Sequence, residues 1–458
     1  MLDINLIRSN PDMVRKDLQK RADSEKAEWL ELLIEKDKQW RALRQEIDVL
    51  RQKRNTLSQQ VNEFKKQGKD IAPLLQEAKQ IPGIVKEKEA GTEQLRKDID
   101  YYLMRMPNIL HDSVPTGKDD SENVIVRSWG KPVVPKFPVK HHGQLAAELG
   151  IADFERAVKI SGAGFFFLKG ELALLDMAAQ RFAIDLLVKK GFTLIQPPFM
   201  IKRKPYEGVT DLADFENVMY KIEGEDAYLI ATSEHPMGAM YMGEIMEESQ
   251  LPIALAGVSA CFRREIGKHG LDERGLFRVH QFNKIEQFIF CRPEDGWEWH
   301  EKLASNAEEL LRKLGLPHNV ANICTGDIGT VAAKKYDVNG WSPREQKYFE
   351  LMSCSNCTAY QATRLGIKYR KKDGSKEFVH TLNSTMAATT RLMRCIIENY
   401  QTAKGTIIVP DALRPYMSGI KEICKAGESR AEKPKEKASA RPKKAAKPKA
   451  KKKRGKGK

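Results

Sequence analysis

The sequence has no apolar run that could cross a membrane and no apolar core of a signal peptide. A membrane helix needs roughly 20 consecutive apolar residues, and residues 1–19 mix charged with apolar side chains. These absences predict a cytoplasmic protein. With 41% hydrophobic and 8% aromatic residues, the composition is that of an ordinary globular protein, and 458 residues allow two or three domains.

The chain has few cysteines, and their number and spacing do not predict a disulfide framework. The seven cysteines are an odd number, which argues against the paired disulfides of a secreted protein. Cys354 and Cys357 form one CxxC, but no second pair follows at zinc-ribbon spacing, and a structural zinc ion needs about four ligands. We therefore expect packing roles for the cysteines and no structural zinc.

The common glycine-rich nucleotide loops are also missing. Neither GxxxxGK[ST] nor GxGxxG occurs in the sequence, and these are the motifs that cradle phosphates with backbone N–H groups. Any ATP site in this chain must therefore be built from side chains.

The net charge of +16 is concentrated at one end of the chain. Residues 425–458 contain 16 lysines and arginines against three acidic residues, so the rest of the chain is nearly balanced. A segment rich in Lys, Ala and Pro cannot bury apolar surface, which predicts a disordered basic tail. The tail could bind RNA without sequence preference. A role in solubility or targeting explains the composition equally well.

Two apolar seams in the first hundred residues predict an antiparallel helical hairpin, a coiled coil. The first has heptad spacing and consists of Trp40, Leu43, Ile47, Leu50, Leu57, Val61 and Phe64, with Arg54 as its charged member. The second runs through Leu74, Ile81, Leu95 and Tyr102. A turn near Gly68 separates them. Each limb has about 35 residues, so the arm should project on the order of 50 Å.

Pro82 and Gly83 disturb the second limb. Proline removes a helix hydrogen bond and clashes with the preceding turn, so we expect a kink or a local break that leaves two shorter helical pieces. A dimerisation coil is the alternative for the hairpin, although such a coil needs only one long helix. An arm of this length suits a large partner with a phosphate backbone, and the runs at 51–54 and 65–66 supply basic side chains.

The rest of the chain predicts an α+β fold. Beyond residues 107–136, which are rich in Pro, Gly and Asp, helical segments alternate with β-rich runs. We place these runs at 193–196, 227–230, 253–258, 278–282, 286–291, 348–352 and 405–409. They do not repeat as regular βαβ units, which favours an antiparallel sheet flanked by helices. The predicted domains are an arm (1–106), a linker (107–136), a main domain (137–424) and a tail (425–458).

Three segments carry the candidate chemistry. Residues 260–265 and 276–282 predict two strands joined by a flexible loop at 266–275, with arginines that suit phosphate oxygens. Residues 381–400 predict a polar strand end followed by a helix with Arg391 in its first turn, where a helix favours anions. Residues 190–198 follow a helix at 172–189 and indicate packing at a subunit interface. For the first segment alone, a charged surface hairpin is the alternative.

Taken in chain order, the segments at 190–198, 260–282 and 381–400 resemble motifs 1, 2 and 3 of the class II aminoacyl-tRNA synthetases. The opening LDINLIRSNPDMVRKDLQKR with the hairpin behind it resembles the tRNA-binding arm of the seryl-tRNA synthetases, and ATSE, RVHQFNKIE, ELMSCSN and TLNST resemble the same family. The resemblance covers roughly residues 1–422. It implies a class II catalytic fold, a homodimer and a serine–tRNA ligase that uses ATP with Mg²⁺ and charges tRNA(Ser); it leaves tRNA(Sec) open.

The resemblance also implies roles for individual residues. The expected ATP-binding set is Arg263, Arg264, Glu265, Arg278, Val279, Phe282, Glu350, Leu351, Met352, Ser353 and Arg391. Of these, Arg263, Glu350 and Arg391 are the expected catalytic residues, and Glu350 with Ser353 would hold Mg²⁺. The expected serine pocket is Thr232, Ser233, Glu234, Arg263, Glu286, Asn383 and Thr385. Ser233, Ser384 and Thr385 depart from a common bacterial-like pattern, which leaves the contacts of Thr385 open.

Three other functions compete with this one. The same core could activate threonine or proline, could belong to a catalytically silent RNA-binding scaffold, or could charge a carrier protein. The long arm argues against the first and the third, and the presence of Arg263, Glu265 and Arg391 argues against the second. Nucleotidyl transfer needs charge neutralisation more than a protein base, so we expect His280 to be structural.

Overall fold

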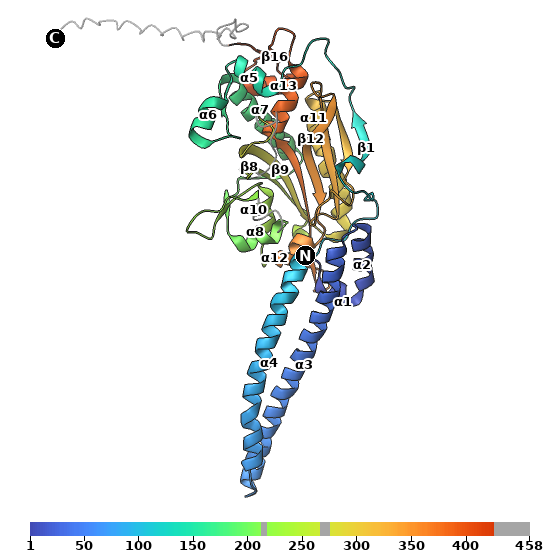
Figure 1. The fold of residues 1–458 in the computed structure, drawn as a ribbon, viewed down its shortest axis with the longest axis vertical. Helices are drawn as coiled ribbons and strands as arrows, with labels where there is room; N and C mark the ends of the chain where they lie inside the picture. The colour runs from blue at the N-terminus through green and yellow to red at the C-terminus, as the bar shows by residue number, and fades with distance from the viewer. Residues whose placement is uncertain (212–217, 266–274, 426–458) are drawn as a thin grey trace, which may run out of the picture.

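The computed structural model describes residues 1–211, 218–265 and 275–425. The predicted basic tail, except for its first residue, and the predicted loop at 266–275, except for its last, lie outside the described residues. Figure 1 shows a long arm of two helices that projects from a body of sheet and helices.

The arm is formed by helices α3 (Ser24–Lys66) and α4 (Ala72–Arg105), which lie side by side (Figure 1). Every apolar residue of the two predicted seams is buried or half-buried, whereas Arg54 is exposed. The prediction of a helical hairpin is therefore confirmed. The 34 residues of α4 span about 51 Å at 1.5 Å per residue, close to the expected length, and α3 is longer because its first turns belong to the base of the arm.

Helix α4 continues through Pro82, so the predicted division of this limb into two helices is wrong. Pro82 and Gly83 are both exposed, which keeps the proline ring away from α3. On either side of the pair, Ile81 is buried and Val85 is half-buried. Packing along the whole seam therefore outweighs the loss of one backbone hydrogen bond.

Two short helices, α1 (Ile4–Ser9) and α2 (Pro11–Lys20), lie at the base of the arm. Their apolar residues form one cluster with both limbs and with Tyr360 of the body. Beside this cluster, buried Asp37 accepts hydrogen bonds from Arg8 at 2.7 Å and from Arg41 at 2.9 Å. Burial would raise the pKa of Asp37, but the two guanidinium groups lower it. The base of the arm is thus fixed by apolar packing and by paired charges.

The body is built on an eight-stranded sheet in the order β1-β10-β11-β12-β15-β9-β8-β4. Its strands are β1 (Val124–Trp129), β4 (Thr193–Ile195), β8 (Ile253–Phe262), β9 (Gln281–Cys291), β10 (His318–Asn322), β11 (Lys334–Ser342), β12 (Lys347–Asn356) and β15 (His380–Ala388). Every pair in this sheet is antiparallel except β4 with β8. The predicted α+β fold with an antiparallel sheet is therefore confirmed.

Several strands differ from their predicted runs. The runs predicted at 278–282 and 286–291 belong mostly to the single strand β9, which begins at Gln281. Strands β10 and β11 were not predicted, and β15 corresponds to the polar strand end predicted at the start of 381–400. Strand β1 comes from residues 107–136, the segment with linker composition, and pairs with β10 at the edge of the sheet.

The two faces of the sheet are covered by different helices. One face packs on α7 (Gly170–Lys189), α11 (Gly296–Lys313) and α13 (Thr389–Tyr400), and the other on α8 (Arg203–Val209), α10 (Glu234–Ala239) and α12 (Tyr360–Leu365). In β9, Ile285 and Ile289 join the first apolar cluster, and Phe288 and Phe290 join the second. Side chains alternate along a strand, so the even-numbered residues of β9 lie on the face of α8 and α10.

Smaller elements complete the body. They are α5 (His142–Glu148), α6 (Phe154–Ser161), β2 (Ala152–Asp153), β3 (Phe167–Leu168), β5 (Met200–Ile201), β6 (Tyr228–Leu229), β7 (Ile245–Glu247), β13 (Lys368–Arg370), β14 (Lys376–Phe378), β16 (Ile407–Ile408), β17 (Glu422–Ile423) and the 3-10 turns η1 (Asp120–Glu122), η2 (Glu248–Gln250), η4 (Pro293–Asp295) and η5 (Asp411–Met417). Among the helices of the described residues, none combines the length and apolar character of a bilayer span.

Gly83→Ala should stabilise the arm. A Cβ at Gly83 would meet no atom within 4 Å, and glycine costs a helix interior about 1 kcal/mol relative to alanine. Amide hydrogen exchange in α4, followed by mass spectrometry, should slow by about fivefold. Gly68→Ala is the matched control and should speed exchange, because Gly68 has a φ of +69° that alanine tolerates poorly. Faster exchange in Gly83→Ala would contradict a continuous helix.

Candidate active site

The expected site residues come together on the sheet face that α8 and α10 cover. They are supplied by β9, β12 and β15 and by the segments that follow β8 and precede β9; these four strands are neighbours in the sheet although far apart in sequence (Figure 1). Helices α10 and α13 add residues from their first turns. Two groups of charged side chains can be distinguished on this face, one around Glu286 and one around Glu350.

The first group lies where β9 pairs with β15. Thr385 stands directly opposite Glu286 in the register, and its Oγ1 donates to Glu286 Oε2 at 3.4 Å. The Nζ of Lys284 lies 2.5 Å from the same carboxylate oxygen and 3.3 Å from Thr232 Oγ1. Glu286 is only 1% exposed. A buried carboxylate is therefore neutralised by a lysine from its own strand.

A second carboxylate, that of Glu234 in α10, belongs to the same group. Its Oε1 accepts hydrogen bonds from Asn383 Nδ2 at 3.0 Å and from Gln361 Nε2 at 3.3 Å. Burial and the neighbouring Glu286 raise the pKa of Glu234 to about 7. Burial also raises the pKa of Glu286, against the effect of Lys284. Two carboxylates held in this way offer acceptors for an ammonium and a hydroxyl group.

The side chain of Ser233 is packed against β8 and does not present its hydroxyl to this group. Its Oγ is buried and has no hydrogen-bond partner within the described ranges. A Cβ at Gly257 of β8 would stand 2.6 Å from that oxygen. Because glycine occupies this position, the start of α10 can approach the sheet closely, and this approach brings Thr232 and Glu234 to the group around Glu286.

The second group is centred on Glu350 of β12 and Arg391 of α13. Arg391 Nη1 lies 3.0 Å from Glu350 Oε2 and donates to the main-chain oxygen of Glu350 at 3.3 Å. Burial would raise the pKa of Glu350, but Arg391 and Lys335 lower it to about 2. On the neighbouring strand, burial and Glu350 raise the pKa of Asp337 to about 7. Glu350 is therefore the ionised carboxylate of this group.

A β-bulge places Glu350 and Ser353 on the same face. Residues three apart in a regular strand point to opposite faces. In β12 the register with β11 shifts after Glu350, so Leu351 has no partner and adds one residue to the strand. Leu351 and Met352 both pack in the apolar cluster of α7, α11 and α13. Their side chains thus lie away from the site, and any contact with a nucleotide would come from their main chain.

Arg263 lies among the charges of both groups. Its guanidinium is 5.2 Å from the centroid of the Phe282 ring. It is also close enough to lower the pKa of Glu234, Glu286 and Glu350. One permanent cation is therefore shared between the Glu286 group and the Glu350 group.

The other residues of the arginine hairpin stand around Phe282. Arg278 Nη1 lies 3.9 Å from Glu265 Oε2, which joins the two ends of the hairpin. Val279 is 2% exposed and can contribute only its main chain, and the N–H of Arg264 donates to Val218 O at 2.8 Å. These positions form the rim of the site on the side of Phe282.

His280 makes contacts within the protein. Its Nδ1 lies 2.7 Å from the hydroxyl of Tyr220 and 2.9 Å from Arg263 O. Its ring stacks on Phe165 at a centroid distance of 5.1 Å. The imidazole thus supports the main chain next to Arg263.

Sequence reasoning missed Lys284 and Asp337. Lys284 lies between Phe282 and Glu286 at a spacing of two residues, which would have indicated a shared strand face. Nothing in the sequence around Asp337 singles it out, because its proximity to Glu350 depends on the pairing of β11 with β12.

Two family models match the chain. Residues 1–110 match the seryl-tRNA synthetase N-terminal domain, and residues 218–400 match the tRNA synthetase class II core domain (G, H, P, S and T). The serine–tRNA ligase of Methanocella arvoryzae is 62% identical over 425 residues, which are 92% of this chain and 100% of that protein.

Solved structures of similar proteins agree with the described fold. The crystal structure of seryl-tRNA synthetase from Pyrococcus horikoshii complexed with ATP is 46% identical, has a TM-score of 0.89, and the match covers 93% of this chain and 100% of that one. The cytoplasmic serine–tRNA ligase from Naegleria fowleri in complex with AMP is 35% identical, with a TM-score of 0.84 and coverage of 93% and 99%.

Glu234 should make stability depend on pH between about 4.5 and about 7. Its pKa of about 7 lies above the usual 4.5, so the folded state binds more protons than the unfolded state, and stability falls as pH rises through this window. Glu234→Gln should remove a fall of about 3 kcal/mol. Urea unfolding at about pH 5 and about pH 7.5 measures the difference. Glu87→Gln, at an exposed arm position, is the control; equal pH slopes in Glu234→Gln and wild type would contradict the shift.

Proposed function

The chain belongs to the seryl-tRNA synthetase family of class II synthetases, and from this premise we propose that it joins serine to tRNA in two steps. In the first, the serine carboxylate attacks the α-phosphorus of ATP and pyrophosphate leaves. In the second, a ribose hydroxyl of the terminal adenosine of tRNA(Ser) attacks the seryl-adenylate. The position of Arg263 between the two charged groups carries this proposal, since a cation there can hold the serine carboxylate and the α-phosphate together.

We assign serine to the polar pocket of Glu234, Glu286, Asn383 and Thr385. The carboxylates can accept from the serine ammonium and hydroxyl, and Lys284 favours the ionised form of Glu286. A site that forms a hydrogen bond with a substrate hydroxyl should have a kcat/KM for alanine lower by a factor of about 10⁴ or more. The reason is that its buried polar groups would stay unpaired with alanine. The extra methyl group of threonine would be excluded by the packing of the pocket.

We assign ATP to the side of Phe282. Phe282 would stack on the adenine, Glu265 would meet its edge, and Arg278 would bind the distal phosphates. Phe282 and Glu286 are four residues apart on one face of β9, a separation of about 13 Å along the strand. An adenylate that lies along β9 would therefore extend from Phe282 to the serine pocket.

Glu350 and Ser353 fit a magnesium ion that accompanies ATP. Mg²⁺ prefers oxygen ligands, and both side chains offer oxygen on one face because of the bulge at Leu351. Glu350 is ionised, with a pKa of about 2. The bound ion would neutralise phosphate charge, and Arg391 both pairs with Glu350 and presents its guanidinium to the phosphates.

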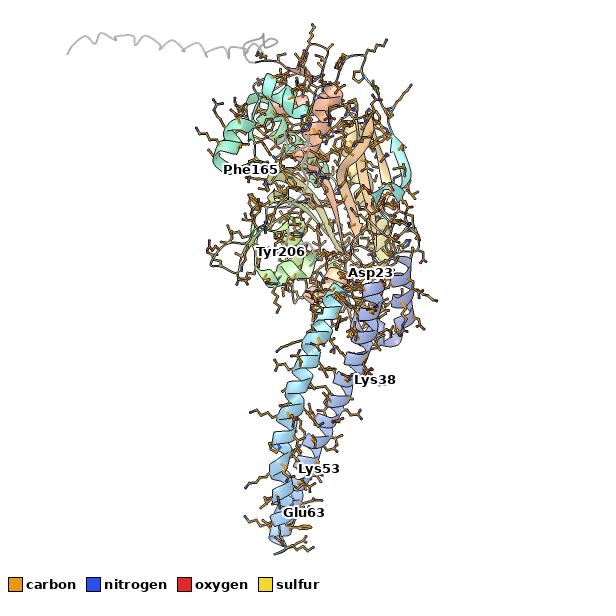
Figure 2. The ribbon with its side chains drawn as sticks, viewed as in Figure 1. Asp23, Lys38, Lys53, Glu63, Phe165 and Tyr206 are labelled. Atoms are coloured by element: carbon orange, nitrogen blue, oxygen red, sulfur yellow. The ribbon has the colours of Figure 1, made fainter. Side chains whose placement is uncertain are left out.

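We propose that the arm binds tRNA. Exposed basic side chains occur on both limbs, among them Lys38, Lys53, Lys65, Lys79 and Lys97. Figure 2 labels Lys38 and Lys53 at two positions along the arm. Their charges suit a phosphate backbone, and the basic tail would add contacts of the same kind.

A homodimer is part of the proposal. Large apolar side chains are exposed on α7, β3 and β4, namely Phe167, Leu174, Met177, Val188 and Leu194. This surface includes the segment that resembles motif 1, and a second copy of the chain would cover it. One subunit's arm could then present tRNA to the other subunit's site. We place the enzyme in the cytoplasm, as the name of the Naegleria fowleri relative indicates for that protein.

Serine-dependent ATP–pyrophosphate exchange, followed by charging of purified tRNA(Ser), tests the function. Exchange should require serine and should be weak with alanine, threonine or proline. A stronger response to any of these three amino acids would refute the assignment of serine.

Arg391→Ala should abolish adenylate formation. The guanidinium next to Glu350 is the charge that would meet the phosphates, so exchange should fall by about 10³-fold or more. Binding of tRNA, measured by filter retention, should not change. Arg370→Ala, at an exposed position of the same body, is the control. Normal exchange in Arg391→Ala would remove this residue from the mechanism.

Shortening the arm should spare adenylate formation and destroy tRNA charging. A Cβ at Gly91 would lie 3.6 Å from Leu43 Cδ1, so these positions face each other across the hairpin. Residues 44–90 can therefore be replaced by a short Gly/Asn turn that leaves the apolar cluster at the arm base intact. Exchange should stay within about twofold of wild type, and charging should fall by about a hundredfold or more. Unchanged charging would contradict the role of the arm.

A further inference from the structure

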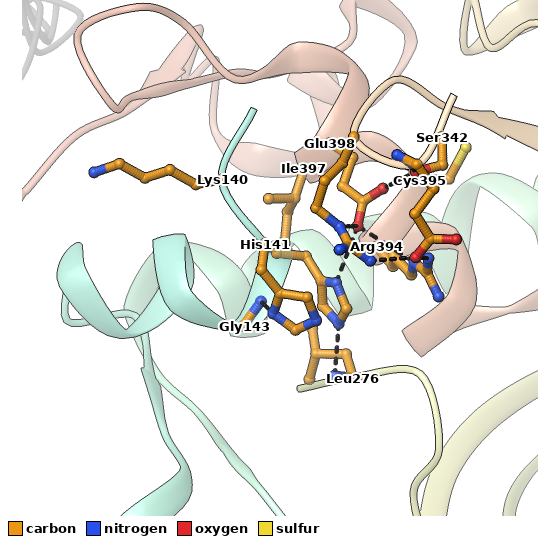
Figure 3. Close-up of polar contacts among 12 residues, drawn as sticks. Lys140, His141, Gly143, Leu276, Ser342, Arg394, Cys395, Ile397 and Glu398 are labelled. Carbon is orange, nitrogen blue, oxygen red and sulfur yellow. Dashed lines mark hydrogen bonds and ion pairs between the residues drawn. The ribbon is translucent and has the colours of Figure 1, made fainter. Parts of the chain in front are cut away.

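A buried polar network connects helix α5 with helix α13 (Figure 3). Its centre is Glu398 of α13, whose side chain is fully buried. Glu398 Oε2 accepts from Ser342 Oγ at 2.5 Å, and Oε1 lies 3.2 Å from His142 Nδ1 and 3.3 Å from Arg394 Nε. Burial would raise the pKa of Glu398, but these neighbours lower it to about 2. The carboxylate at the centre is therefore ionised.

The hydrogen bonds of His142 fix its protonation. The main-chain N–H of Leu276 donates to His142 Nε2 at 3.0 Å (Figure 3). Nε2 must therefore be an acceptor, and the ring hydrogen lies on Nδ1, which donates to Glu398. Burial lowers the pKa of His142, which agrees with a neutral ring. The contact is closely packed, because a Cβ at Gly275 would stand 2.5 Å from Nε2.

Arg394 connects the same network to the residue that follows Leu276. Its guanidinium lies 4.3 Å from the ring centroid of Phe277 and 4.3 Å from that of Phe349. The guanidinium of Arg391 lies 5.3 Å from the Phe277 ring. Leu276 and Phe277 are thus both attached to α13, the first through His142 and Glu398 and the second through its ring.

These attachments lie on the ATP side of the site. Phe277 is followed directly by Arg278, and α13 carries Arg391 in its first turn. The network includes no residue of the pocket assigned to serine. A change at His142 should therefore alter the positions of Arg278 and Arg391, which we assign to the ATP phosphates. It should not alter the residues that we assign to serine.

We propose that His142 is a positioning residue for ATP: its Nε2 holds the main chain at Leu276, and thereby fixes the position of Arg278 relative to Arg391. The inference rests on the proposed function, in which both arginines bind ATP. It assigns to His142 a role beyond packing, because a single acceptor atom fixes the irregular segment that carries Arg278 and leads into β9.

Two substitutions separate the two hydrogen bonds of His142. Asparagine places an amide N–H₂ near the position of Nδ1 and keeps a donor for Glu398, but it has no acceptor for Leu276. Glutamine places its carbonyl oxygen near the position of Nε2 and keeps that acceptor. In serine-dependent ATP–pyrophosphate exchange, His142→Asn should raise KM for ATP by about tenfold, the effect of one lost hydrogen bond, with KM for serine unchanged. His142→Gln should return KM for ATP close to the wild-type value.

The controls separate positioning from general loss of structure. His141→Asn changes the adjacent ring, which accepts from the N–H of Gly143, and should leave both KM values unchanged. Phe277→Leu weakens the second attachment and should also raise KM for ATP alone. If His142→Asn left KM for ATP unchanged, or if both His142 variants raised both KM values equally, the inference would be overturned. Failure of the wild type to exchange with serine would instead refute the proposed function.

Discussion

A charge buried in protein is costly unless an opposite charge accompanies it, and the active face of this sheet is organised by that constraint. Buried Glu286 is paired with Lys284, the partly exposed Glu350 with Arg391, and buried Glu398, in α13 beyond this face, with Arg394. The first two pairs lie where substrates would add charges of both signs. A phosphate can replace Glu350 as a partner of Arg391, and an ammonium can share Glu286 with Lys284, so binding exchanges partners instead of creating unpaired charge.

The arm shows how far sequence pattern determines structure. The heptad seam at Ile47 and Leu57 predicted a helix correctly, because apolar spacing reports directly on a packed face. Pro82 misled the same reasoning, because its cost is local and the gain from packing is spread over the whole of α4. Strand β15 was predicted only as a polar strand end before a helix, because its residues, such as Asn383 and Thr385, are polar and resemble a loop. Their burial follows from pairing with β9 and β12, which composition does not report.

The candidate site was predicted in part for similar reasons. Resemblance supplied Arg263, Glu350 and Arg391, and the structure brings both arginines to the carboxylate of Glu350. Lys284 was not predicted, since a lysine in a strand is usually solvated, and only the buried carboxylate beside it gives it a function. The role of His142 was even harder to predict from the sequence, because its contact with Leu276 joins segments that are 134 residues apart.

The bulge at Leu351 makes the direction of side chains depend on how β12 pairs with β11. If β12 kept all its residues but paired without the bulge, strict alternation would turn Ser353 toward the helices. Removal of Leu351 would instead leave Glu350 and Ser353 two residues apart and therefore still on one face. During divergence of such a protein, a one-residue deletion at the bulge would thus preserve the direction of both groups, whereas loss of the bulge at unchanged length would not.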